Sequence, residues 1–128
     1  NALVSLRQHV LGRLIVIFGA GGDRDQNKRV LMGRVASQHA DVIYVTDDNP
    51  RGEDPQLIRN AILAGCPQGI EIGDRAEAIL VSVDELKDGD ALLIAGKGHE
   101  TDQIIGDMAF PFNDIEQASM AIEILDRN

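Results

Sequence analysis

The sequence has one cysteine, no tryptophan, one tyrosine and three phenylalanines among its 128 residues. Because a lone Cys66 can neither pair within the chain nor supply a zinc site, we expect neither a disulfide nor a metal centre built on thiols. No apolar run approaches the roughly 18 residues of a membrane span, and the first residues do not resemble a signal peptide. We therefore expect a cytoplasmic protein without a membrane partner.

Positive charge is also scarce, since 12 Lys and Arg residues face 21 Asp and Glu residues for a net charge of −9. A binder of the nucleic-acid backbone needs a basic face, so nucleic acid is not expected as a partner. The basic residues that are present gather locally at Arg24, Lys28, Arg29 and Arg34. This cluster indicates either a site for a small anion or only a solvated helix face, and the composition leaves both open.

What is present is ordinary globular composition, with 44% hydrophobic and 26% charged residues. The length suits one domain over residues 1–128. Uninterrupted apolar runs of the kind buried on both faces of a parallel sheet alternate with helical periodicity. The sequence thus predicts an α/β fold with a mostly parallel sheet. Strands are expected at 14–18, 42–46, 71–72 and 91–95, helices at 3–11, 25–38, 55–64, 74–83 and 114–125, and a small β-hairpin at 104–109.

Three predicted strands end in polar loops rich in glycine or proline, at 19–24, 47–51 and 96–100. Ligands of open α/β sheets bind at the carboxyl ends of the strands, so we expect the three loops to converge on one site. The first loop begins like a dinucleotide-binding G-x-G-x-x-G, but Arg24 stands in place of the third glycine. No segment matches a Walker phosphate loop. Two hypotheses remain for this loop. Either the turn holds an anion together with Arg24, or the glycines only make the turn.

The other two loops mix both signs of charge. Asp48 and Asn49 precede Pro50 and Arg51, whose planar guanidinium suits bidentate binding of a carboxylate. An Asx turn with a surface arginine would explain the same residues. Together with Gly96 to Glu100, these loops would form a pocket for a zwitterion such as an amino acid. No nucleophile–base pair is visible, so no catalytic residue is expected in this chain, and a stand-alone module that binds an anion or a nucleotide remains the alternative.

The order of these segments resembles the C-terminal domain of the Mur ligases, in particular the members that add meso-diaminopimelate. The resemblance rests on the segments 21–25, 28–29, 31–33, 46–51, 73–79 and 95–100, and its most specific element is the tetrapeptide Asp48–Arg51. It implies a Rossmann-like domain of three layers with helices on both faces of the sheet. It also implies that the domains that bind the UDP-sugar and ATP lie outside this chain, which opens within a helical pattern.

The members that add meso-diaminopimelate join it to UDP-MurNAc-L-Ala-D-Glu with ATP and Mg²⁺. We expect neither ATP nor Mg²⁺ to bind this domain tightly. By resemblance, the residues that contact meso-diaminopimelate are Arg24, Asp48, Asn49, Pro50, Arg51, Gly96 and Glu100. Diaminopimelate differs from lysine by one distal carboxylate, and a buried arginine awaiting that group would be left unpaired by lysine. We assign Arg51 to this carboxylate with help from Asn49, Glu100 and the Gly96 carbonyl to the distal ammonium, and Arg24 to the proximal carboxylate.

Overall fold

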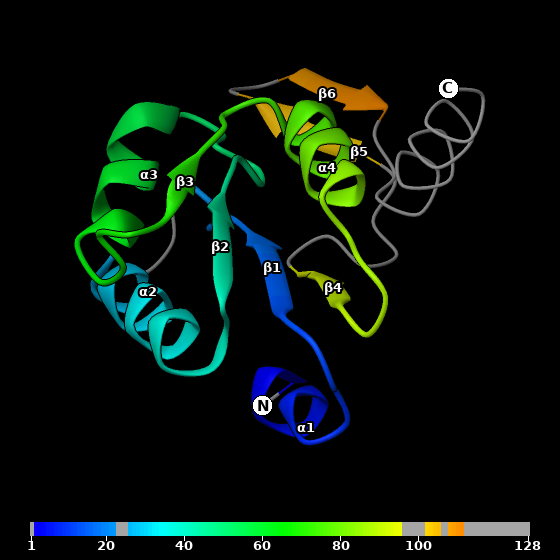
Figure 1. Ribbon diagram of the computed structural model, residues 1–128. Coiled ribbons are helices and arrows are strands. Elements are labelled where there is room, and N and C mark those ends of the chain that lie inside the picture. The colour runs from blue at the N-terminus through cyan, green and yellow to red at the C-terminus, as the bar shows by residue number, and fades with distance from the viewer. Residues whose placement is uncertain (1, 23–25, 96–101, 106–107, 112–128) are drawn as a thin grey trace.

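The computed structural model describes residues 2–22, 26–95, 102–105 and 108–111 (Figure 1). A four-stranded, entirely parallel sheet has the order β3-β2-β1-β4, and β5 pairs with β6 as a separate antiparallel hairpin. The elements are α1 (Ala2–Arg7), β1 (Leu14–Phe18), α2 (Asn27–His39), β2 (Val42–Val45), α3 (Pro55–Leu63), β3 (Ile70–Glu71), α4 (Arg75–Asp84), β4 (Ala91–Ile94), β5 (Asp102–Ile105) and β6 (Met108–Pro111).

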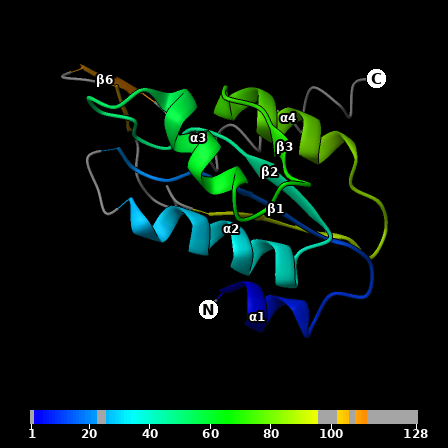
Figure 2. The ribbon, with the colours of Figure 1, turned by 90° about the vertical axis from the view of Figure 1, so that its left-hand side faces the viewer.

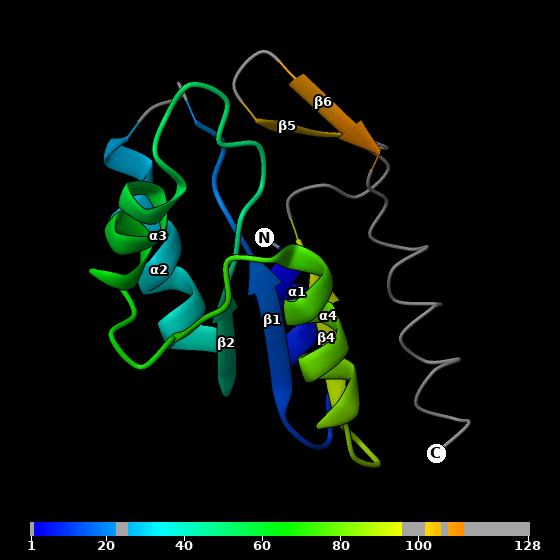
Figure 3. The ribbon, with the colours of Figure 1, turned by 90° about the horizontal axis from the view of Figure 1, so that it is seen from above.

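Helices cover both faces of the sheet, as seen from above in Figure 3. On one face Val16 and Phe18 of β1 pack in a cluster with residues of α2 and α3. On the other face Ile15 and Ile17 pack with Ala78 and other residues of α4 and β2. All five residues of β1 are buried, because the strand lies between β2 and β4 and is covered from both sides.

The predicted helix starts of α3 and α4 are confirmed. The Asp54 carboxylate accepts from the backbone N–H of Gln56, and Pro55 takes the first helical position, where its missing N–H costs nothing. Asp74 accepts from the backbone N–H groups of Ala76 and Glu77. Both caps satisfy amides that a helix leaves without intrahelical partners.

The buried face of α2 agrees only in part with the sequence pattern, whose helical spacing predicts that Val30, Leu31, Val35 and Ala36 point inward. Ala36 is buried as predicted, but Leu31 is 52% exposed, whereas Arg29 is only 3% exposed. The helix turns the row Arg29, Gly33 and Ala36 toward the protein, and Gly33 comes close to the carbonyl of Ile62 in α3, where a Cβ would lie 2.2 Å from that oxygen. The helix expected at 114–125 lies outside the described residues.

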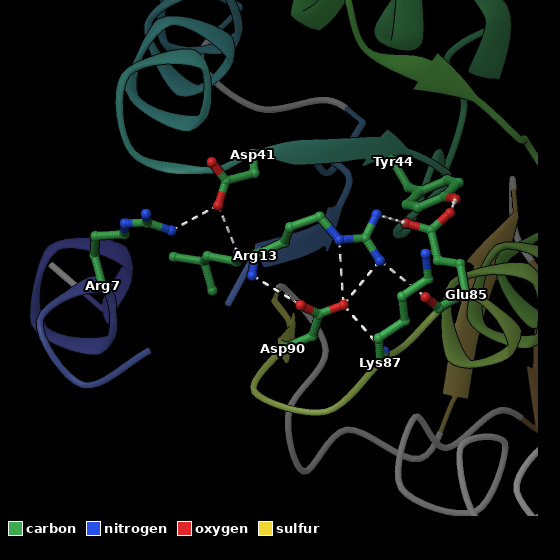
Figure 4. Close-up of polar contacts among 8 residues, drawn as sticks. Arg7, Arg13, Asp41, Tyr44, Glu85, Lys87 and Asp90 are labelled. Atoms are coloured by element: carbon green, nitrogen blue, oxygen red, sulfur yellow. Dashed lines mark hydrogen bonds and ion pairs between the residues drawn. The ribbon is translucent and has the colours of Figure 1, made fainter. Parts of the chain in front are cut away.

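A polar network joins the chain segments at the amino ends of the strands (Figure 4). Arg13 donates from Nη2 to Asp90 at 2.8 Å and to the carbonyl oxygen of Glu85 at 2.9 Å. The side-chain bond of Arg13 to Asp90, together with the Arg13 backbone N–H on the same carboxylate, lowers the pKa of Asp90 to about 2. The hydroxyl of Tyr44 donates to Glu85, and burial is the main cause that raises the pKa of Tyr44 to about 12.

α1 lies beside α2, at the same face of the sheet (Figure 2). Among the helices of the described part, none is long and apolar enough to cross a membrane.

Candidate functional site

The carboxyl ends of β1, β2 and β4 lie at one edge of the sheet. Phe18 is in register with Val45, and Ile17 with Ile94, so the chain leaves all three strands on the same side (Figure 1). The convergence predicted for the first two loops is confirmed. Of the predicted binding residues, Asp48, Asn49, Pro50 and Arg51 are described, whereas Arg24, Gly96 and Glu100 lie outside the described residues.

The loop after β1 touches the loop after β2 through their backbones. The N–H of Gly22 donates to the carbonyl oxygen of Asn49 at 2.6 Å. A Cβ on Gly22 would lie 1.7 Å from the carbonyl oxygen of Pro50, so only glycine permits this approach. The glycines of the first loop therefore not only make the turn but also allow the Asp48–Arg51 segment to pack directly against the loop.

Arg51 lies across both loops and is half-buried. Its Nη1 donates to the carbonyl oxygens of Gly22 at 3.2 Å and Asn49 at 3.4 Å. Within the part of the chain that the structure describes, the guanidinium makes no hydrogen bond besides these two. Most of its five N–H donors therefore remain for a ligand. Arg51 also has a φ of +51°, a left-handed backbone conformation that costs a non-glycine residue about 1–2 kcal/mol.

The neighbours of Arg51 in the tetrapeptide are drawn inward. Asn49 is 5% exposed and Pro50 is fully buried, while Asp48 is half-buried. Strained backbone and buried polar side chains at a loop tip are typical of binding sites, where the surrounding structure enforces a costly conformation. The segment is thus held as a rigid unit rather than as a loose surface turn.

A buried ion pair outside the predicted site residues supports this segment. Arg29 of α2 donates to both carboxylate oxygens of Glu53, at 2.6 and 2.9 Å, and from Nη2 to the carbonyl oxygen of Gly21 at 3.1 Å. The N–H of Glu53 in turn donates to the carbonyl of Pro50. Arg29 therefore links the glycine loop to the end of the Asp48–Arg51 segment. The helical spacing of Arg29 with Gly33 and Ala36 is the signal that could have revealed its burial.

Asp47, just before the tetrapeptide, is held at each of its polar groups. Its carboxylate accepts from Arg59 at 2.5 Å, its N–H donates to the carbonyl of Gly73 at 3.3 Å, and its own carbonyl accepts from Arg75 at 3.1 Å. Burial raises the pKa of Asp47 although Arg59 opposes this effect. The Asp47 carboxylate is thus paired with Arg59 of α3, and this contact stabilises the loop.

Arg75 is 1% exposed and bridges two strands that are not neighbours. Its Nη1 donates to the carbonyl oxygen of Asp47 after β2, and its Nη2 to that of Ala95 after β4, at 2.9 Å. The segment 73–79 contains Arg75, but Arg75 is not among the predicted site residues. Its burial depends on both strand ends, which a local pattern cannot reveal.

A cavity of about 530 Å³ opens on the α2 face, where α1, α2, β1 and β4 meet. Among the described residues, its lining is almost wholly apolar with Lys28 as the charged residue, and this chemistry does not suit a zwitterion. No cluster of three metal-ligating side chains occurs within residues 2–22, 26–95, 102–105 and 108–111. The carboxyl edge is therefore the candidate site: a polar, partly buried set of donors and acceptors presented on loops of restricted geometry.

The comparisons with known proteins agree with one another. The family described as Mur ligase, glutamate ligase domain, matches residues 1–98. The chain is 55% identical over 122 residues to the UDP-N-acetylmuramoyl-L-alanyl-D-glutamate–2,6-diaminopimelate ligase of Bradyrhizobium diazoefficiens, covering 95% of this chain and 25% of that protein. It is 50% identical over 126 residues to the ligase of the same name from Agrobacterium fabrum, covering 98% of this chain and 26% of that protein.

A solved structure of a UDP-N-acetylmuramoyl-L-alanyl-D-glutamate–2,6-diaminopimelate ligase superposes with a TM-score of 0.93 at 38% identity, over 99% of this chain and 27% of that chain. The chain thus spans about a quarter of the length of the relatives it matches. With the family match over most of its length, the chain belongs to the Mur ligases and corresponds to their C-terminal, glutamate ligase domain.

Proposed function

We propose that this chain is the part of a meso-diaminopimelate-adding ligase that binds and orients the incoming amino acid. The observation that carries the proposal is the position of Arg51, whose guanidinium lies across the two loops at the carboxyl edge with donors left for a ligand. The names of the relatives in Bradyrhizobium and Agrobacterium support 2,6-diaminopimelate as the amino acid.

Arg51 provides the discrimination in this proposal. Its planar fork binds the distal carboxylate of meso-diaminopimelate, and the buried Asn49 lies beside it. Lysine has no such carboxylate, so its binding would leave a desolvated guanidinium without its anion. A site built to bind a polar group rejects an analogue that lacks the group by roughly 10⁴-fold. The described loops thereby select the substrate and hold its amine in a fixed direction, which accelerates attack by proximity and orientation.

Arg24, Gly96 and Glu100 complete the proposed site as the resemblance implies, Arg24 at the proximal carboxylate and the other two at the distal ammonium. The sequence has no phosphate loop, and the described residues contain no cluster of three metal-ligating side chains. Activation of the dipeptide carboxylate is accordingly assigned to the three quarters of the ligase outside this chain, together with the UDP-MurNAc-dipeptide site.

The experiment replaces the matching quarter of the Bradyrhizobium ligase with this chain and measures kcat/KM for meso-diaminopimelate and L-lysine. We expect a strong preference for meso-diaminopimelate, which Arg51→Ala reduces by at least about a hundredfold. The matched control is Arg34→Ala, which removes an exposed arginine of α2 and should leave the preference unchanged. A preference that survives Arg51→Ala would exclude Arg51 as the carboxylate ligand, and an active hybrid without any preference would exclude the proposed selection.

A further inference from the structure

We propose that Arg75 is a positioning residue for amino-acid selection, which holds the Asp48–Arg51 segment in place against the end of β4 without touching the ligand. The inference deepens the proposed function and rests on it. Asp47 directly precedes the Asp48–Arg51 segment, and Ala95 directly follows β4. Arg75 donates to the carbonyl oxygens of both Asp47 and Ala95.

Arg75 links the ends of two strands across the edge of the sheet. It is the first residue of α4, where the Asp74 cap fixes the start of the helix. The strands that it joins, β2 and β4, lie on either side of β1. No backbone ladder connects β2 with β4 directly, so the guanidinium supplies a link that the sheet does not provide. Its planar fork presents two donors in a fixed geometry, and this geometry fixes the two carbonyls relative to each other.

The turn that contains Arg75 makes two further hydrogen bonds to the residues that follow β2. The Thr46 hydroxyl donates to the carbonyl of Gly73 at 3.1 Å, and the N–H of Asp47 donates to that carbonyl as well. Any shift of the 73–75 turn therefore moves Asp47 and, through two and four peptide units, Asn49 and Arg51. A misplacement of about 1 Å can cost a hundredfold in rate when a site depends on orientation.

Burial assigns Arg75 to support rather than to ligand binding. The residue is 1% exposed, and both terminal nitrogens donate to backbone oxygens, whereas Arg51 is only half-buried. Loss of Arg75 should thus affect the amino acid through the geometry of its loops. The substrates held elsewhere in the ligase should bind as before.

The test uses the hybrid ligase described above with Arg75→Lys, which keeps a positive charge but loses the fork. Loss of one hydrogen bond from a charged donor corresponds to about tenfold, so we expect KM for meso-diaminopimelate to rise about tenfold. KM for ATP and for the UDP-MurNAc-dipeptide should stay within about twofold. The matched control is Arg13→Lys, because Arg13 also joins two segments through Asp90 and the Glu85 carbonyl, but at the opposite edge.

A second variant guards against failure of Arg75→Lys to fold. Thr46→Val removes only the hydroxyl that grips Gly73, and we expect it to raise KM for meso-diaminopimelate by about threefold. Unchanged KM for meso-diaminopimelate in both variants, or an equal rise for all three substrates, would overturn the proposal. The same would follow if Arg13→Lys gave an equal rise for meso-diaminopimelate.

A measurement without substrate separates this inference from the proposed function. In the 128-residue chain, Arg75→Lys should shift the NMR amide signals of Asp48, Asn49 and Arg51, while Arg13→Lys should leave them in place. If the unmodified hybrid ligates neither amino acid, the proposed function fails, and these shifts still decide whether Arg75 positions the loop. Amide signals that do not move with Arg75→Lys would overturn the positioning role itself.

Discussion

The amide nitrogen of Gly22 and the carbonyl oxygen of Asn49 lie 2.6 Å apart, and this hydrogen bond joins the loop after β1 to the loop after β2. The contact makes one surface of two segments that are separated by a helix and a strand in the sequence. Arg51 and Arg29 reinforce it from its two sides, since each donates to a carbonyl of the glycine loop. The binding residues are therefore positioned by contacts between loops as much as by the sheet.

Gly22→Ala tests this close approach. The new Cβ would lie 1.7 Å from the carbonyl oxygen of Pro50, a backbone atom that cannot rotate away, so the loops must separate. We expect a loss of about 1–3 kcal/mol in the free energy of unfolding, measured with urea, and weaker binding of meso-diaminopimelate. Gly69→Ala is the control. Its Cβ would lie 3.0 Å from the end of the Leu63 side chain and 3.1 Å from the carbonyl oxygen of Cys66, so the clash is milder and should cost less. Equal costs would contradict the close packing of the two loops.

The left-handed backbone at Arg51 predicts different outcomes for two substitutions. Arg51→Gly and Arg51→Ala both remove the guanidinium and should both abolish the preference for meso-diaminopimelate over lysine. Glycine tolerates a φ of +51°, whereas alanine does not, so the glycine variant should be more stable by about 1 kcal/mol. Thermal and urea unfolding of the two variants provide the comparison. An alanine variant as stable as the glycine variant would show that the residue does not retain this conformation.

The ion pair of Arg29 and Glu53 predicts strong coupling. Arg29 is 3% exposed, and Glu53→Gln removes the negative charge that faces its guanidinium. Because breaking a buried ion pair from one side leaves a charge poorly compensated, we expect a destabilisation of about 3 kcal/mol.

A double-mutant cycle with Arg29→Met and Glu53→Leu measures the coupling directly. The double variant should lose clearly less than the sum of the two single variants. Additive losses would mean that the two side chains stabilise the loop independently of each other.

Asp90 predicts a pH dependence of stability. Its bonds to Arg13 lower its pKa to about 2 from an ordinary 3.8, so the unfolded chain takes up this proton before the folded chain does. The contribution of Asp90 is thus complete above about pH 5 and is lost as the pH falls toward 2. Asp90→Asn should lower the free energy of unfolding at pH 7 and flatten its slope between pH 2 and 5.

The control for this titration is Asp88→Asn, in the same loop but exposed, which should leave the slope unchanged. Urea unfolding at several pH values gives both profiles. If Asp90→Asn kept the full slope, the acid sensitivity would have to come from other carboxylates.

Much of the fold could be predicted from local sequence. The strand Leu14–Phe18 and the starts of α3 and α4 follow from an apolar run, from Pro55 and from the Asp74 cap, and each is found as predicted. The parallel arrangement then places the loops after β1 and β2 together, because parallel strands end at one edge. Asp48 to Arg51 could be recognised as a candidate site for the same reason.

Tertiary structure decided which polar groups are buried and what they hold. Helical periodicity predicts that Leu31 lies on the buried face of α2. Arg29 is buried instead, because its guanidinium donates to oxygens of Glu53 and Gly21. Arg75 is buried because Asp47 and Ala95, distant in sequence, offer carbonyls on either side of β1. A charge enters the interior only where partners from other segments compensate its desolvation. Local sequence patterns are enough to place the elements and the edge at which the loops meet, whereas the way the loops are held depends on how those elements pack.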